Sequence, residues 1–154
     1  MLFLLFQLGS ERYALDVHEV AEVLPLVSIK PIPQAPAGIA GVFNYRGTAV
    51  PVVDLSALML GAPARVRLST RLVLVHQTGS SGEGRLLGLI AESATKTLRR
   101  DAADFAPSGV SPPGTPYLGP VTTGADGIIQ WITAAKLLSP AVKEVLFRSP
   151  EVAV

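Results

Sequence analysis

Few residues of this sequence have the types and spacing that catalysis or metal binding needs. His18 and Glu19 begin like the zinc motif H-E-x-x-H, but Glu22 stands where the second histidine would be. Asp101 and Asp104 lie three residues apart next to two arginines, which favours local charge pairs on an exposed turn over an acid–base pair. The absence of cysteine excludes disulfides and thiolate chemistry. We therefore expect no catalytic residue, no metal and no cofactor.

Motifs for nucleophilic or nucleotide chemistry are also missing. No serine stands in a G-x-S-x-G context, and no lysine follows a glycine as a phosphate-binding loop would require. The segment that starts at Gly82 resembles a dinucleotide fingerprint, but its last glycine comes one place late, at Gly88. A predicted strand follows where the fingerprint needs a helix, so a hairpin loop is the better interpretation.

The most informative polar residue is Arg46. It is the only charged residue between Lys30 and Asp54, and a cation inside such an apolar stretch usually has a partner. Glu22 is the natural candidate, because Glu19 is expected to take part in a helix cap. The residues alone leave a second interpretation equally open, in which Arg46 simply lies in water on a turn.

Composition narrows the classes of function. The chain has 154 residues, 49% of them hydrophobic, and 13 Lys and Arg balance 12 Asp and Glu. These values exclude intrinsic disorder and argue against a nucleic-acid binder. The longest uncharged stretch, residues 105–125, contains five prolines and cannot span a membrane as a helix. We expect one cytoplasmic domain without direct membrane insertion.

Short apolar runs bounded by glycine and proline predict a mainly β fold, either a sandwich or a small barrel. The predicted strands are residues 2–8, 12–15, 49–53, 71–76, 85–91, 117–122 and 128–132. Residues 77–84 read as a long mobile hairpin loop, and residues 108–116 as a proline-rich surface connection. No repeat has a fixed period, although two similar small barrels could be present without showing one.

Three short helices are predicted from their first and last residues. The first would cover residues 17–24, with Asp16 and Glu19 as a capping box and Pro25 as its end. The second would run over residues 55–60, capped by Asp54 and ended by Gly61. A C-terminal helix would follow Ser139 and Pro140 and continue to about residue 147.

The stretch PAGIAGVFNYRG (residues 36–47), followed by VPVVDL (residues 50–55), resembles the signature of the CheW family of chemotaxis coupling proteins. That signature reads P-x-x-I-x-G-V-x-N-x-R-G-x-x-x-P-V-x-D-L. The flanking segments follow the family order, so the resemblance extends from Phe3 to Phe147. The central signature is specific, whereas the flanks alone would be weak.

The resemblance implies a single CheW-like domain over residues 1–148, made of two five-stranded SH3-like barrels packed together, and a C-terminal tail over residues 149–154. It implies a non-enzymatic adaptor that joins the cytoplasmic tips of methyl-accepting receptors to the regulatory domain of a CheA-type histidine kinase. The receptor hairpin would lie in a groove between the barrels. The implied partner-binding residues are Val20, Glu22, Ile39, Asn44 and Arg46, with Glu22 and Arg46 as a structural ion pair.

Some residues depart from the family pattern. Tyr45 stands where leucine is common, Glu92 where aspartate is usual, and Lys96 at a position that is often acidic. These departures suggest a divergent, non-flagellar pathway such as surface sensing. The alternative function is a small β-barrel module that binds another protein or nucleic acid, and nucleic-acid binding would need a basic stripe interleaved with aromatic residues.

Overall fold

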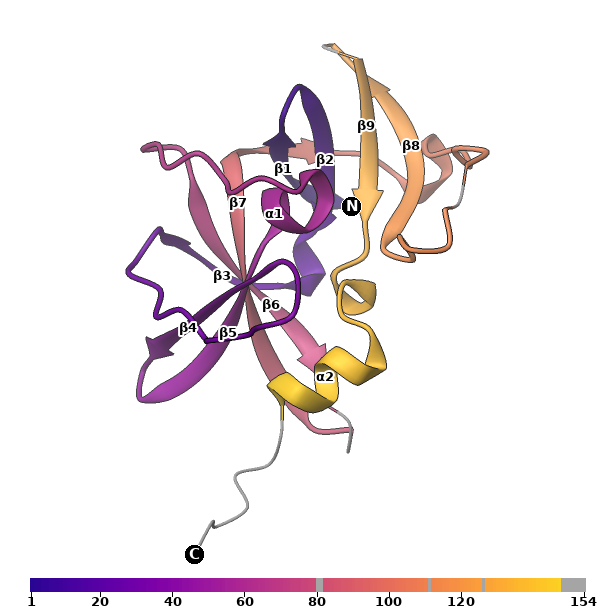
Figure 1. The fold of residues 1–154 in the computed structure, drawn as a ribbon. Helices are drawn as coiled ribbons and strands as arrows, with labels where there is room; N and C mark the ends of the chain where they lie inside the picture. The colour runs from indigo at the N-terminus through magenta and orange to yellow at the C-terminus, as the bar shows by residue number, and fades with distance from the viewer. Residues whose placement is uncertain (80–81, 111, 126, 148–154) are drawn as a thin grey trace, which may run out of the picture.

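The computed structural model describes residues 1–79, 82–110, 112–125 and 127–147 and consists mainly of β-strands (Figure 1). The strands are β1 (Leu2–Leu8), β2 (Glu11–Asp16), β3 (Val20–Pro25), β4 (Ile39–Tyr45), β5 (Thr48–Asp54), β6 (Arg71–Thr78), β7 (Gly84–Arg99), β8 (Leu118–Gly124) and β9 (Gly127–Ile132). The helices are α1 (Leu55–Leu60), α2 (Pro140–Leu146) and the 3-10 turns η1 (Val17–Glu19), η2 (Ala102–Asp104) and η3 (Ala134–Lys136).

Strand β7 belongs to two five-stranded sheets. Its first half, up to Ala91, pairs with β6 and β5, and its second half, from Glu92, pairs with β1. Near the junction, Ser93 has a φ of 51°, in the left-handed region that serine seldom adopts. This backbone conformation changes the direction of the strand, so a single strand runs through both halves of the molecule.

The two sheets share one topology. The sheet order is β3-β6-β7-β5-β4 in what we call the central barrel and β7-β1-β2-β9-β8 in the terminal barrel. In both, successive pairs are antiparallel, antiparallel, parallel and antiparallel. The chain visits these positions in the same cyclic order, and the terminal barrel is completed by the N-terminal strands β1 and β2. The similarity of the barrels is therefore structural and involves a circular permutation.

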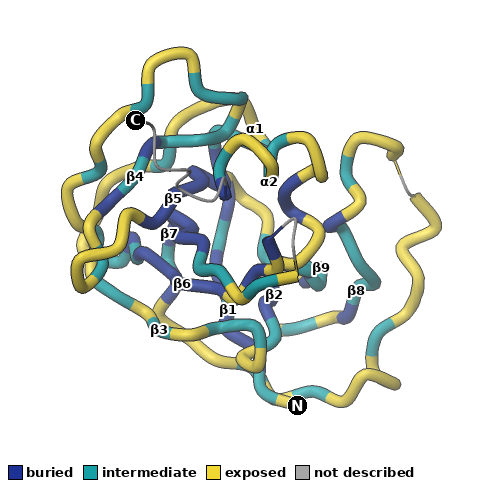
Figure 2. Tube along the Cα trace, turned by 90° about the horizontal axis from the view of Figure 1, so that it is seen from below, coloured by how far each residue is buried: buried dark blue, intermediate teal, exposed yellow. Residues whose placement is uncertain are grey.

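Apolar side chains form one cluster in each barrel and a larger one between them. Figure 2 shows in dark blue the buried residues along strands such as β5, β6 and β7. Alternation along the strands explains this division, because successive residues face opposite sides of a sheet. On β6, Leu72 and Leu74 belong to the cluster of the central barrel, whereas Val73 and Val75 belong to the cluster between the barrels. In the terminal barrel, the ring of Phe3 packs edge-on against Trp131.

Most predicted elements are confirmed. All seven predicted strands are present, and β7 extends eight residues beyond its predicted end at Ala91. Helix α1 has the predicted bounds, with the Asp54 side chain accepting from the Ala57 amide (3.2 Å) and Gly61 in the left-handed conformation. Ser139 caps α2 by accepting from the Val142 amide (3.2 Å). Local capping signals therefore located both α-helices.

The helix predicted over residues 17–24 is wrong. Only the 3-10 turn η1 forms, and the chain continues as β3, in which half-buried and exposed residues alternate. Asp16 caps η1 by accepting from the His18 amide, and the Glu19 carboxylate accepts from the Ala135 amide instead of closing a capping box. The β-branched valines of this segment favour a strand, and pairing with β6 stabilises it.

The predicted loops are partly described. Strands β6 and β7 pair up to Thr78 and Gly84, which confirms the hairpin but shortens its loop from the predicted residues 77–84 to residues 79–83. Residues 80–81 of this loop lie outside the described residues. Residue 111 of the proline-rich connection and the predicted tail, residues 149–154, also lie outside them. Within the described residues, no helix is long and apolar enough to cross a membrane.

Candidate functional site

Glu22 of β3 is at the centre of a polar cluster that connects β3 to the β4–β5 hairpin. The Tyr45 hydroxyl donates a hydrogen bond of 2.6 Å to Glu22 Oε2. Arg46 Nη2 lies 3.9 Å from Glu22 Oε1, at the outer limit of an ion pair, and 77% of the Arg46 side chain is exposed. Water screens such a pair strongly, so the tyrosine hydrogen bond is the tighter contact.

The guanidinium of Arg46 also lies over the ring of Tyr45, with its central carbon 5.0 Å from the ring centroid. A cation in this position is attracted by the negative face of the ring. Tyr45 therefore orients both charged side chains, one through its hydroxyl and the other through its ring. We call Glu22, Tyr45 and Arg46 the polar cluster.

The hairpin turn determines where Arg46 lies. Arg46 and Gly47 connect β4 to β5 with φ values of 51° and 86°, as a two-residue type I′ turn requires. The Asn44 side chain accepts a hydrogen bond of 2.8 Å from the Gly47 amide. Asn44, predicted as a partner-binding residue, thus stabilises the turn that presents Arg46.

The structure does not bring the five predicted residues together in one place. Glu22, Asn44 and Arg46 lie around the hairpin turn, whereas Val20 and Ile39 are half-buried and pack against the cluster between the barrels. Ile39 also lines a hollow of about 340 Å³ between the barrels, together with Val53 from the central barrel and Leu137 from the segment after β9.

Tyr45 is the functional candidate that sequence reasoning missed. The sequence marked it only as a departure from the family pattern. The sequence signal for Tyr45 was its position next to Arg46 in a polar turn. Its hydrogen bond to Glu22 could not be expected from the sequence, because it depends on β3 being a strand. Two valines of this region are also exposed, because 36% of Val17 on η1 and 42% of Val23 on β3 are accessible to solvent. Val23 lies on the face of β3 opposite to Glu22, since it pairs with Val73 and Glu22 pairs with Leu74.

Other candidate groups have structural roles. Glu92 is buried and forms an ion pair of 3.0 Å with Arg65. Asp104 accepts a hydrogen bond from the Asp101 amide at the start of η2, which confirms the local turn interpretation. His18 Nδ1 lies 3.1 Å from Asp16 Oδ1. In the described part of the chain, no three side chains of His, Cys, Asp or Glu form a group that could hold a metal ion.

Comparison with known proteins shows which family the chain is similar to. The model of the CheW-like domain matches residues 2–142. The chain belongs to the CheW-like domain family. It is 30% identical over 103 residues to a chemotaxis protein CheW of Rhizobium meliloti, a match that covers 67% of this chain and 63% of that protein. It is 31% identical over 149 residues to protein FrzA of Myxococcus xanthus, covering 95% of this chain and 90% of FrzA.

A solved structure supports the architecture of this CheW-like domain. The scaffolding protein TtCheW from Thermoanaerobacter tengcongensis superposes with a TM-score of 0.76 at 27% identity, over 90% of this chain and 87% of that one. The predicted fold, two five-stranded SH3-like barrels with a few short helices, is confirmed. The chain also spans less than two thirds of the Rhizobium meliloti relative, although it spans most of FrzA.

Proposed function

We propose that this chain is a non-enzymatic adaptor that couples the cytoplasmic tips of methyl-accepting receptors to the regulatory domain of a CheA-type histidine kinase. The match to the CheW-like domain over residues 2–142 carries the proposal. The similarity to TtCheW, which is described as a scaffolding protein, supports it. The adaptor would act in the cytoplasm, at receptor arrays, without inserting into the membrane itself.

The receptor tip would bind beside the polar cluster. Val17 and Val23 offer exposed apolar area on η1 and β3. Glu22 lies on the opposite face of β3, which is an edge strand, so a receptor tip would reach around this edge to contact Glu22 and Arg46 as well. A helical hairpin recognises such a surface through a few apolar anchors surrounded by polar contacts. Arg46 would both contact the receptor and, with Tyr45, hold Glu22 in place.

Capture on immobilised partners tests this site. Receptor cytoplasmic fragments and the kinase regulatory domain from the same organism are each incubated with the wild-type protein and with Arg46→Ala. We expect Arg46→Ala to lose receptor capture and keep kinase capture. Arg67→Ala is the matched control, because Arg67 is an exposed arginine on the loop after α1. Normal receptor capture by Arg46→Ala would exclude Arg46 from the receptor site.

A non-flagellar pathway, such as surface sensing, is the finer part of this proposal. Its support is the departure from the family pattern at Tyr45, Glu92 and Lys96. Deletion of the gene should impair movement or development on surfaces and leave swimming unchanged. A swimming defect with normal surface behaviour would contradict this assignment.

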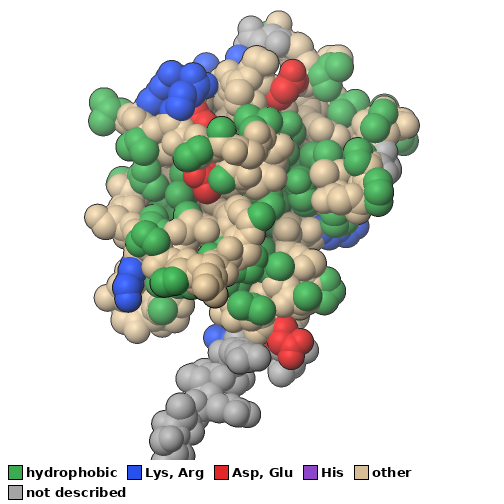
Figure 3. Space-filling view, in the orientation of Figure 1, with side chains coloured by type: hydrophobic (Ala, Val, Ile, Leu, Met, Phe, Trp, Pro, Cys, Tyr) green, Lys and Arg blue, Asp and Glu red, His purple; other side chains and the backbone are tan. Residues whose placement is uncertain are grey.

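The alternative of nucleic-acid binding is not favoured. The formal net charge is +1, and on the face shown in Figure 3 the Lys and Arg side chains gather at separate places instead of forming a continuous stripe. Binding to nucleic acid depends on such a stripe and weakens steeply with salt. Salt-sensitive binding of DNA by this protein would favour the nucleic-acid alternative over the adaptor function.

A further inference from the structure

Strands β5 and β7 diverge at one end of the central barrel and leave a pocket. Their parallel pairing covers Val52–Asp54 and Gly88–Ile90, although β5 already begins at Thr48 and β7 at Gly84. A pocket of about 460 Å³ lies where the pairing of β5 with β7 stops. It is lined by the segments of these two strands that do not pair with each other. This volume falls within the range of sites that bind small ligands or peptide side chains.

The backbone in this pocket has unused hydrogen-bonding capacity. In an antiparallel ladder, alternate residues direct their N–H and C=O groups toward the partner strand, and the others direct them away. The register places Ala49 of β5 opposite Asn44, between the hydrogen-bonded pairs, so its backbone groups face β7. By the same alternation, Leu86 of β7 faces β5, as Gly88 does where the two strands pair. The pocket is therefore bordered by two strand edges.

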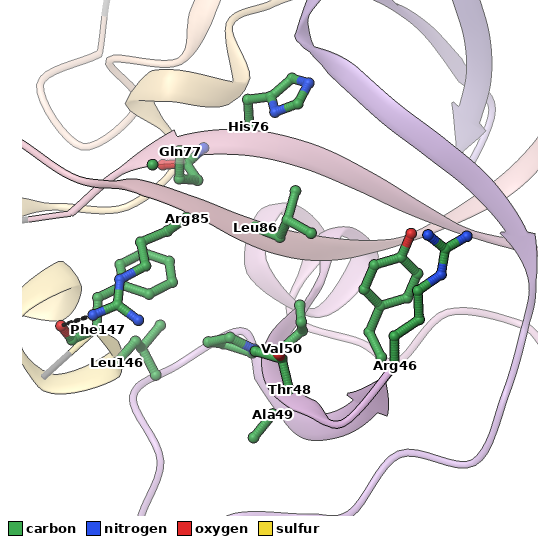
Figure 4. A pocket seen from close by; sticks show the side chains of 13 residues that line it. Arg46, Thr48, Ala49, Val50, His76, Gln77, Arg85, Leu86, Leu146 and Phe147 are labelled. Atoms are coloured by element: carbon green, nitrogen blue, oxygen red, sulfur yellow. Dashed lines mark hydrogen bonds between the residues drawn. The ribbon is translucent and has the colours of Figure 1, made fainter. Parts of the chain in front are cut away.

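The charged side chains around the pocket are cationic, and the other side chains are apolar or, as in Tyr45, Thr48 and Gln77, polar and uncharged. Figure 4 shows Arg46 and Arg85 at opposite ends, with Val50 and Leu86 between them. Among the described residues that line it there is no aspartate or glutamate. The polar contacts of Arg85 are long, 3.3 Å to Glu83 and 3.4 Å to the carbonyl of Phe147. Each arginine has a carboxylate partner outside the pocket, Glu22 at 3.9 Å from Arg46 and Glu83 at 3.3 Å from Arg85. A ligand carboxylate at either end would add to or replace these long contacts.

We propose that this pocket binds an extended acidic segment of a partner protein, which adds a β-strand between the diverging ends of β5 and β7. Its backbone would hydrogen-bond to Ala49 and Leu86, an apolar side chain would cover Val50, and acidic side chains would reach Arg46 and Arg85. Strand addition of this kind combines backbone affinity with side-chain specificity. The site shares Arg46 with the receptor surface beside β3, whereas Arg85 belongs to the pocket alone and therefore distinguishes the two.

Titration followed by NMR tests the proposal on the full chain with isotope-labelled amides. The probe is the capped pentapeptide Glu-Val-Glu-Val-Glu. We expect amide shifts to change at residues 48–50 and 84–86, and Arg85→Gln to weaken the fitted affinity roughly ten-fold through the loss of a charged hydrogen bond. Arg67→Gln, at an exposed arginine outside the pocket, should leave the affinity unchanged.

Two further probes make the test specific. The peptide with N-methylated valines should bind roughly ten-fold more weakly, because it lacks the donors that strand pairing needs. Equal binding of Lys-Val-Lys-Val-Lys, or shifts confined to the surface of η1 and β3, would overturn the proposal. Receptor capture should be normal in Arg85→Gln. A failure of the pocket proposal can therefore be distinguished from a failure of the adaptor function.

The chain's own C-terminus is the competing occupant, because Phe147 lines the pocket and residues 148–154 follow it. A variant that ends at residue 147 settles this point without any peptide. If its shifts at residues 48–50 and 84–86 match those of the full chain, the pocket is free for a partner, as proposed. If they differ as they do on peptide binding, the C-terminus occupies the pocket and the proposal is wrong.

Discussion

Arg46 occupies a backbone conformation that arginine seldom adopts. Its φ of 51° belongs to a turn position where asparagine and glycine are preferred. A side chain kept in such a conformation serves something other than local stability, and residues of this kind concentrate at functional sites. The sequence isolated Arg46 and suggested Glu22 as its partner. It could not indicate that Tyr45 makes the shorter contact, because that depends on how β3 and β4 lie together.

Asparagine at position 46 should separate folding from binding. Asn tolerates the left-handed conformation, so Arg46→Asn is expected to retain or raise the free energy of unfolding in urea. Arg46→Val, with its β-branched side chain, should lower it by about 1–2 kcal/mol. If Arg46→Asn were clearly less stable than the wild type, the contacts of Arg46 with Tyr45 and Glu22 would outweigh the backbone effect.

The hydroxyl of Tyr45 reports on the polar cluster. The hydrogen bond to Glu22 raises the pKa of Tyr45 above its usual value, burial adds to this, and the charge of Arg46 opposes it. The hydrogen bond therefore contributes stability at neutral pH that is lost as pH rises through the raised pKa. We expect Glu22→Gln to bring the pKa of Tyr45 down, measured by NMR of the ring carbons. An unchanged pKa would show that the two groups do not interact in solution.

At the scale of elements, the structure departs from the sequence interpretation at β3. Val17, Val20 and Leu24 have helical spacing, and Asp16 with Glu19 resembles a capping box. The segment is nevertheless a strand, because pairing with β6 and packing of Val20 between the barrels outweigh this local signal. By contrast, α1 and α2 were predictable, because their caps and glycine or proline punctuation lie within a few residues of each other.

Substitutions of Ser93 test whether its backbone conformation allows the continuous strand β7 to run through both barrels. Its left-handed φ of 51° is strained for serine and easy for glycine. Ser93→Gly should therefore be neutral or stabilise the fold by up to about 1 kcal/mol, as measured by chemical denaturation. Ser93→Val should destabilise it by about 1–3 kcal/mol. Equal stability of both variants would mean that the change of direction does not depend on this residue.

At the scale of the whole molecule, the two barrels share a topology that the sequence does not reveal. The terminal barrel is assembled from both ends of the chain, so no simple repeat of sequence could align it with the central barrel. Only the family resemblance predicted two barrels. The apolar cluster between them also follows from tertiary packing, because the strand pattern alone does not say which face meets the other barrel.

We propose that residues 1–148 unfold as one unit, since β7 and the cluster between the barrels belong to both halves. Leu89 is 1% exposed in that cluster, and Leu74 is fully buried in the central barrel. Leu89→Ala and Leu74→Ala should each lower the free energy of unfolding by about 2–5 kcal/mol. Calorimetry should show a single transition in both variants. Two separate transitions would show that the barrels are independent domains.

The coupling function itself is tested most directly by a bridging measurement. Receptor cytoplasmic fragments on beads are mixed with the kinase regulatory domain, with and without this protein. We predict that the kinase domain is retained only when the wild-type protein is present, and that Arg46→Asn abolishes retention while Arg67→Ala does not. Retention of the kinase domain that is unaffected by adding the protein, or its absence under all conditions, would contradict the adaptor function.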